Sequence, residues 1–184
     1  MRNEGFTLPD WKTVGQAYTH RMIPWYPEAI AAETGALFLA LTLLRTFRNW
    51  SFQIDIRLLI GFHLIRFVGV YFLYLYARQE LPYSFAVWGG VGDIAVAALA
   101  LFVIRFVNFR PGLIAWNFIG LADILGVAVI AARSEMQSPG SMHQLDKFPL
   151  ILLPTLVVPL VIFTHVLMLM RAFRTATPPT CCSK

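Results

Sequence analysis

Apolar residues run along this chain in five long, nearly continuous segments that are separated by short polar connections. The segments lie at roughly 26–46, 55–77, 84–106, 112–132 and 148–170. Each is close to the ~20 residues that an α-helix needs to cross the hydrocarbon core of a bilayer. The connections are too short to fold as separate domains. The pattern therefore predicts an all-α fold, a polytopic transmembrane bundle of five helices.

The two ends of the chain are more polar than the apolar segments. Residues 1–25 form an N-terminal arm in which apolar and aromatic residues recur at helical spacing from Trp11 to Met22, so we expect an interfacial helix there. The arm lacks the ordered basic, apolar and cleavage regions of a signal peptide. Residues 26–170 then form the predicted bundle, and residues 171–184 form a short polar tail.

Composition supports a membrane protein. Hydrophobic residues make up 58% of the chain and charged residues only 14%, against roughly 25% charged residues in soluble domains. The net charge is +5, but the basic residues sit mostly at the ends of the apolar segments, where such charges set topology. We therefore expect the lipid bilayer as the partner and no nucleic acid. The two adjacent cysteines of the tail indicate neither a disulfide framework nor a zinc site.

The distribution of basic residues also predicts an orientation. With five spans, the N-terminal arm and the second and fourth connections share one face, which carries six basic residues. The other face carries eight, in denser clusters next to the spans. Because cytoplasmic connections are enriched in Lys and Arg, the C-terminus is predicted in the cytoplasm and the N-terminus outside.

Three charged residues lie near the middle of the predicted spans. Asp93 follows GGVG in the third span, Asp123 lies within GLADILG in the fourth, and Arg66 supplies the opposite charge in the second. A helix rises ~1.5 Å per residue. Counted from the ends of the predicted spans, all three residues therefore lie at a similar depth, near the middle of the bilayer. A charge within a span is costly, and its default interpretation is functional. We therefore expect the three side chains to meet in the middle of the bundle.

Small residues surround both acids. On a helix with 3.6 residues per turn, Asp93 shares one side with several glycines and alanines, and such a side lets another helix approach closely. The acids should then face protein rather than lipid. The glycines expected at helix contacts are Gly89, Gly90, Gly120 and Gly126.

Three further polar side chains lie within the spans. His63 precedes Arg66 by one turn, Asn117 lies on the fourth span, and His165 lies on the fifth beyond two internal prolines. Two acids against one base leave an excess of one negative charge, so a proton is shared or a cation is held. The predicted ligand-binding or ion-binding residues are Arg66, Asp93, Asn117, Asp123 and His165.

The succession from RFVGVYF through WNFIGLAD to LPTLVVPLVIFTHVLML resembles an uncharacterised group of small bacterial integral membrane proteins. The resemblance covers roughly residues 63–170 and implies the bundle topology and the bacterial inner membrane. It does not mark His63 and implies no activity. The positions that it marks are Arg66, Gly69, Pro82, Asp93, Asn117, Asp123, Pro154, Pro159 and His165.

Four hypotheses of function remain open. The first is a binding or transport protein whose buried cluster holds a proton, a cation or a small polar ligand. The second is a structural or accessory subunit of a larger membrane complex, with other membrane subunits as partners. The third is a b-type haem protein with His63 and His165 as axial ligands. The fourth is an intramembrane enzyme with Asp93 or Asp123 as general acid, but no nucleophile motif supports it, so a non-enzymatic role is favoured.

Overall fold

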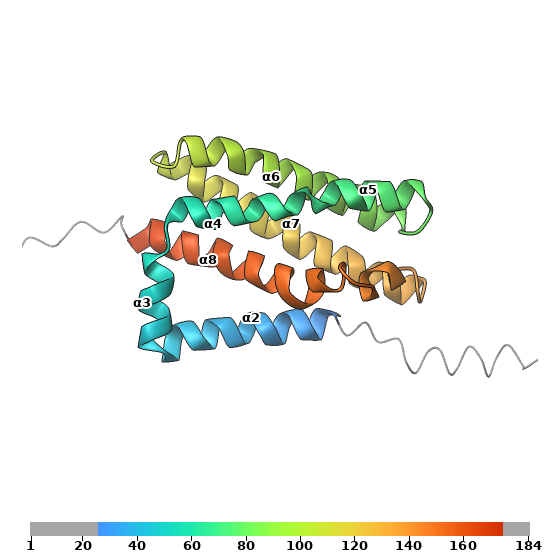
Figure 1. Cartoon of the computed structure of the whole chain (residues 1–184), viewed down its shortest axis with the longest axis horizontal. Coiled ribbons are helices and arrows are strands. Elements are labelled where there is room, and N and C mark those ends of the chain that lie inside the picture. The colour runs from blue at the N-terminus through green and yellow to red at the C-terminus, as the bar shows by residue number, and fades with distance from the viewer. Residues whose placement is uncertain (1–25, 175–184) are drawn as a thin grey trace, which may run out of the picture.

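The computed structural model describes residues 26–174 as a bundle of helices with no strand in that range (Figure 1). The predicted all-helical class is confirmed for this part of the chain, whereas the predicted N-terminal arm and most of the tail lie outside it. The elements are α2 (Tyr26–Leu43), α3 (Arg45–Gln53), α4 (Ile56–Phe62), η1 (His63–Val68), α5 (Gly69–Ala77), η2 (Ser84–Gly89), α6 (Gly90–Arg105), α7 (Arg110–Gln137), η3 (His143–Asp146), η4 (Leu153–Val157) and α8 (Val158–Arg174).

Four continuous helical runs within the described residues are long and apolar enough to cross a membrane. They are Ile56–Ala77, Ser84–Arg105, Arg110–Gln137 and Leu153–Arg174. The first predicted span differs, because its helix ends at Leu43 and the chain turns by 100° into α3. Length and composition thus give four spans, or five when this bent pair is counted as one, so the prediction of five spans is not confirmed.

The turn between α2 and α3 follows from a change in the sequence pattern. Leu44 adopts an extended backbone, with φ −96° and ψ 103°, which ends the first helix. The next nine residues alternate basic and aromatic side chains at helical spacing, and Phe47 packs against Phe163 of α8 with ring centroids 6.0 Å apart. Arg45 stays exposed. As a result α3 lies across one end of the bundle (Figure 1).

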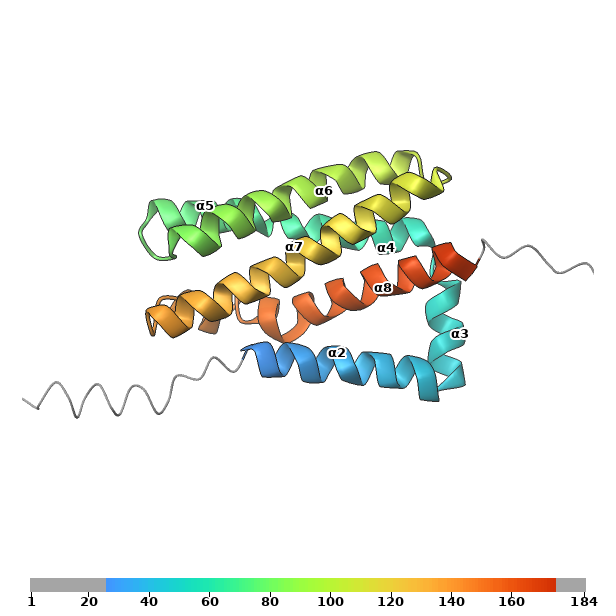
Figure 2. The same ribbon diagram turned by 180° about the vertical axis from the view of Figure 1, so that it is seen from behind.

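The other helices run along the bundle, with α8 between α2 and α7 when the molecule is viewed from behind (Figure 2). The helical run Leu153–Arg174 contains α8. In its most apolar stretch 56% of the residues are buried, against 33–39% in the corresponding stretches of the other three runs. The final helix is therefore the most enclosed. This explains how it can carry His165 as a side chain with no exposed surface.

Two apolar core clusters fill the two ends of the bundle. The cluster at the α3 end includes Ile60, Trp116 and Leu167, and the cluster at the opposite end includes Phe72 and Phe85. On η1, α6 and α7, buried and partly buried polar residues lie between these two clusters, and on α8 they lie next to Phe163 of the first cluster. They form what we call the polar layer: His63, Arg66, Asp93, Asn117, Asp123, Thr164 and His165.

Candidate functional site

Close contact between two helix backbones brings Arg66 to Asp93. Gly69 of α5 and Gly90 of α6 face each other, and a Cβ atom added at Gly90 would lie only 2.8 Å from the carbonyl oxygen of Gly69. Neither position has room for a side chain. Since Arg66 and Asp93 each lie three residues from these glycines, one turn away, the contact places the guanidinium directly against the carboxylate.

Arg66 bonds to three groups on two other helices. Its Nε donates to Asp93 Oδ1 at 2.6 Å, one Nη donates to the backbone carbonyl of Gly120 at 3.1 Å, and the other Nη donates to Asp123 Oδ2. The Arg66 side chain is 2% exposed, that of Asp93 6% and that of Asp123 19%. The three charged residues predicted to meet are therefore in contact, and they join η1, α6 and α7.

Glycines shape the surroundings of this cluster, although not all in the predicted way. A Cβ atom at Gly92 would fall on the Asp123 carboxylate, and one at Gly120 would lie 2.5 Å from His165 Nε2. Gly89 packs on Val127 at α7. The expectation for Gly126 is wrong, because nothing lies within 4 Å of its added Cβ.

The two histidines lie beside the charged cluster, on the side toward α3. Their ring centroids are 4.0 Å apart, and the ring of Trp116 lies 5.1 Å from each. Gly120 connects the two groups, because its carbonyl accepts from Arg66 while its Cα faces His165. The five predicted ligand-binding residues thus form one continuous layer. His63 belongs to it as well.

The hydrogen bonds assign a tautomer to His165. The Asn117 amide nitrogen donates to the Leu113 carbonyl at 2.8 Å, so its Oδ1 faces His165 Nδ1 at 2.9 Å as an acceptor. His165 must therefore donate from Nδ1, so in the neutral ring Nε2 carries the lone pair. Within the described residues this buried Nε2 has no hydrogen-bond partner.

The same reasoning assigns the tautomer of His63. Thr164 has one hydroxyl hydrogen, which it donates to the Leu160 carbonyl at 2.8 Å, so it accepts from His63 Nε2 at 3.2 Å. In the neutral ring, His63 Nδ1 then carries the lone pair, and it has no hydrogen-bond partner in the described part of the chain. Thr164 was not among the predicted site residues, because a threonine in an apolar run gives no signal in the sequence.

The histidine geometry does not fit the haem hypothesis. An iron held between two imidazoles separates their ring centroids by roughly 6 Å, since each metal–nitrogen bond is about 2 Å long. The His63 and His165 rings are 4.0 Å apart and in direct contact, which leaves no space for a porphyrin between them. Among the described residues, no group of three or more His, Cys, Asp or Glu side chains is placed to hold a metal ion.

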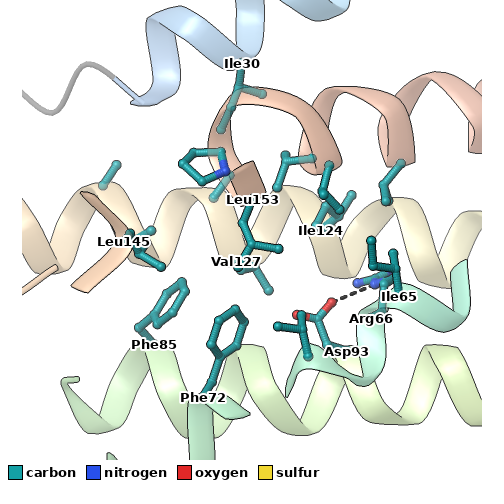
Figure 3. Close-up of a pocket in the computed structure, with 18 of the residues that line it drawn as sticks. Ile30, Ile65, Arg66, Phe72, Phe85, Asp93, Ile124, Val127, Leu145 and Leu153 are labelled. Atoms are coloured by element: carbon teal, nitrogen blue, oxygen red, sulfur yellow. Dashed lines mark hydrogen bonds and ion pairs between the residues drawn. The ribbon is translucent and has the colours of Figure 1, made fainter. Parts of the chain in front are cut away.

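A cavity of about 60 Å³ adjoins the charged cluster on the side away from the histidines. Arg66 and Asp93 lie at one end of it, and Phe72, Phe85 and Leu145 lie at the other (Figure 3). All its other lining residues are apolar. The cluster is therefore reached from an apolar space inside the bundle.

Comparison with known proteins places this arrangement in a family. A family model described as a domain of unknown function, DUF8737, matches residues 23–173. The chain belongs to the DUF8737 family. No curated protein and no solved structure matches it. The DUF8737 match covers the whole polar layer and agrees with the expected membership of an uncharacterised family.

Proposed function

We propose that this DUF8737 protein is a multi-pass membrane protein whose Arg66–Asp93–Asp123 cluster binds one positive charge, a proton or a cation, in a binding or transport role. The observation that carries the proposal is the pairing of a single buried guanidinium with two carboxylates. An ionised pair of acids with one arginine has an excess of one negative charge. Such a charge in a low-dielectric interior is costly unless a proton or cation neutralises it.

The outer surface of the bundle supports membrane insertion. Large apolar side chains are exposed around it as well as packed inside it, for example Val70, which is 56% exposed, Phe102, which is 62% exposed, and Phe118, which is 53% exposed. A soluble monomer rarely exposes so many large apolar side chains, whereas lipid chains would cover them. The four apolar helical runs have the length that this requires.

The two acids face different spaces, which favours transport over static binding. Asp93 lines the internal cavity. Asp123 is not among the residues that line it, and its side chain is 19% exposed at the seam between α6 and α7, beside the partly exposed Gly92. Arg66 bonds to both acids. A proton or cation could therefore reach one acid from the cavity and leave from the other.

Charge at the two ends supports the predicted orientation. Seven arginines lie at the α3 end of the described chain, against the single acid Asp55. At the opposite end, three basic residues in the helix ends and connections face four acids. By the positive-inside rule, the α3 end faces the cytoplasm. The seven are Arg45, Arg48, Arg57, Arg105, Arg110, Arg171 and Arg174.

Labelling tests the orientation. A single cysteine introduced at Asn49 of α3 should resist an impermeant thiol reagent in intact cells, in a background that lacks Cys181 and Cys182. A cysteine at Ser138, beyond the end of α7, should react. The opposite pattern would reverse the proposed orientation.

Infrared spectroscopy tests charge binding. In purified protein at neutral pH without added metal salts, we expect a protonated carboxyl band that disappears in Asp93→Asn or Asp123→Asn. Glu28→Gln, at an exposed position on α2, is the matched control and should keep the band. If the cluster binds a metal cation instead of a proton, the protonated carboxyl band appears only in the absence of the metal salt and disappears when the salt is added. A spectrum with no such band and no response to salt would refute the proposal.

A second candidate is a structural role within the bundle of an accessory subunit, with other membrane subunits as partners. The observation in its favour is the position of the ion cluster, one turn from the backbone contact between Gly69 and Gly90. Charges there would fix which helices pair. Proton flux into proteoliposomes separates the two functions. A purely structural cluster predicts the same flux in the parent and in the charge-free variant Arg66→Met, Asp93→Asn, Asp123→Asn.

A further inference from the structure

Three departures from regular α-helix converge on the cavity beside Asp93. The 3-10 segment η1 contributes Ile65 and Arg66, the π-helical turn η2 contributes Phe85, and the π-helical turn η4 contributes Pro154 and its neighbours. The 3-10 segment lies in the middle of the run Ile56–Ala77, and the two π-helical turns open the runs Ser84–Arg105 and Leu153–Arg174. Such irregular segments are uncommon and often mark functional sites. Their common cavity indicates a binding site rather than a packing defect.

The polar end of the cavity has unused hydrogen-bonding capacity. Asp93 Oδ1 accepts from Arg66, and no hydrogen bond within the described residues involves the second oxygen of this carboxylate. Arg66 has five N–H groups, three of which are directed to Asp93, Asp123 and Gly120. The cavity therefore presents a carboxylate acceptor within a cluster that carries a formal excess of one negative charge.

The size and walls of the cavity restrict what can occupy it. A volume of about 60 Å³ exceeds the space that one water molecule needs, but it is far below the ~300–1,000 Å³ of pockets for drug-sized ligands. Apart from Arg66 and Asp93, the walls are apolar. The cavity therefore has room only for a polar head group and the first few carbons of an occupant. Because the cavity is partly open, a longer apolar chain can extend out of it.

We propose that this cavity binds the head of a lipophilic primary amine, with the ammonium group on Asp93, the first carbons directed toward Phe72 and Phe85, and the rest of the apolar chain outside the cavity. The proposal rests on the proposed function and identifies the positive charge as the head of an amphiphile. An ammonium donates to the free Asp93 oxygen and offsets the negative excess. A carboxylate head would add a third negative charge, and a hydroxyl head would leave the excess uncompensated.

The test uses decylamine, which is protonated at neutral pH, with decanol and decanoate as probes of equal chain length. Binding of radiolabelled decylamine to the full chain in non-ionic detergent is measured by scintillation proximity. We expect saturable binding by the parent that unlabelled decylamine displaces. Decanol should compete at least ten-fold more weakly and decanoate should not compete. Competition by decanoate as strong as by decylamine would overturn the proposal.

Variants locate the binding. Ala128→Phe and Ala131→Phe both fill the cavity from α7, so either suffices if the other fails to fold. Each should weaken decylamine binding at least ten-fold, as should Asp93→Asn. Ala98→Phe, at an exposed position on α6 that does not line the cavity, is the matched control and should bind as the parent does.

Unchanged binding in a folded cavity-filling variant or in Asp93→Asn would overturn the assignment, as would the absence of saturable binding by the parent. Failure here is distinguishable from failure of the proposed function. If decylamine does not bind but the carboxyl band of Asp93 and Asp123 is present, the cluster binds a proton and the amphiphile proposal alone is wrong.

Discussion

Removing the charge of Arg66 is the sharpest test of the cluster. Arg66→Met keeps most of the length of the side chain but deprives the buried Asp93 carboxylate, the partly buried Asp123 carboxylate and the Gly120 carbonyl of their donors. Breaking a buried pair by removing one partner costs about 3–5 kcal/mol. Because two acids lose their partner here, we expect the upper end of this range. The loss should shrink as the pH falls, since protonation neutralises the orphaned acids.

The triple variant Arg66→Met, Asp93→Asn, Asp123→Asn is the matched comparison. It leaves no unpaired buried charge, and replacement of a whole buried ion network is often close to neutral. We therefore expect its free energy of unfolding to lie within about 2 kcal/mol of the parent value. This free energy should not change with pH over the range in which the stability of Arg66→Met rises. Unfolding by SDS titration in mixed micelles measures both variants. An Arg66→Met variant as stable as the parent at every pH would show that the three residues are not paired.

Other predictions follow from single contacts. Gly90→Leu should destabilise the bundle strongly, because its backbone contact leaves no room for a side chain, whereas Gly126→Leu should be near neutral in thermal unfolding in detergent. Glu135→Ala should cost about 1–3 kcal/mol in the same assay, because its carboxylate accepts the backbone N–H groups of two residues after α7, at 2.6 and 3.0 Å. Nitrogen NMR should find the proton of His165 on Nδ1 and that of His63 on Nε2, and the opposite tautomers would refute the assigned network.

The sequence by itself determined the helical class and the bounds of two of the long helical runs. The predicted segment 55–77 corresponds to Ile56–Ala77, and 84–106 to Ser84–Arg105, because an unbroken apolar run between charged ends has few alternatives to a helix. It also identified Arg66, Asp93 and Asp123 as partners. Charged residues within apolar runs need compensation, and their similar depth left few possible pairs.

Only the tertiary structure decided how these elements meet. The turn at Leu44 and the backbone contact of Gly69 with Gly90 depend on the surfaces of other helices, which helical periodicity does not describe. The same holds for the ring contact of His63 with His165 and for the hydroxyl of Thr164, since the groups in contact come from spans about a hundred residues apart. Periodicity gives the side of a helix on which a residue lies. Which neighbour that side faces, and at what distance, is set by the packing of all the helices together.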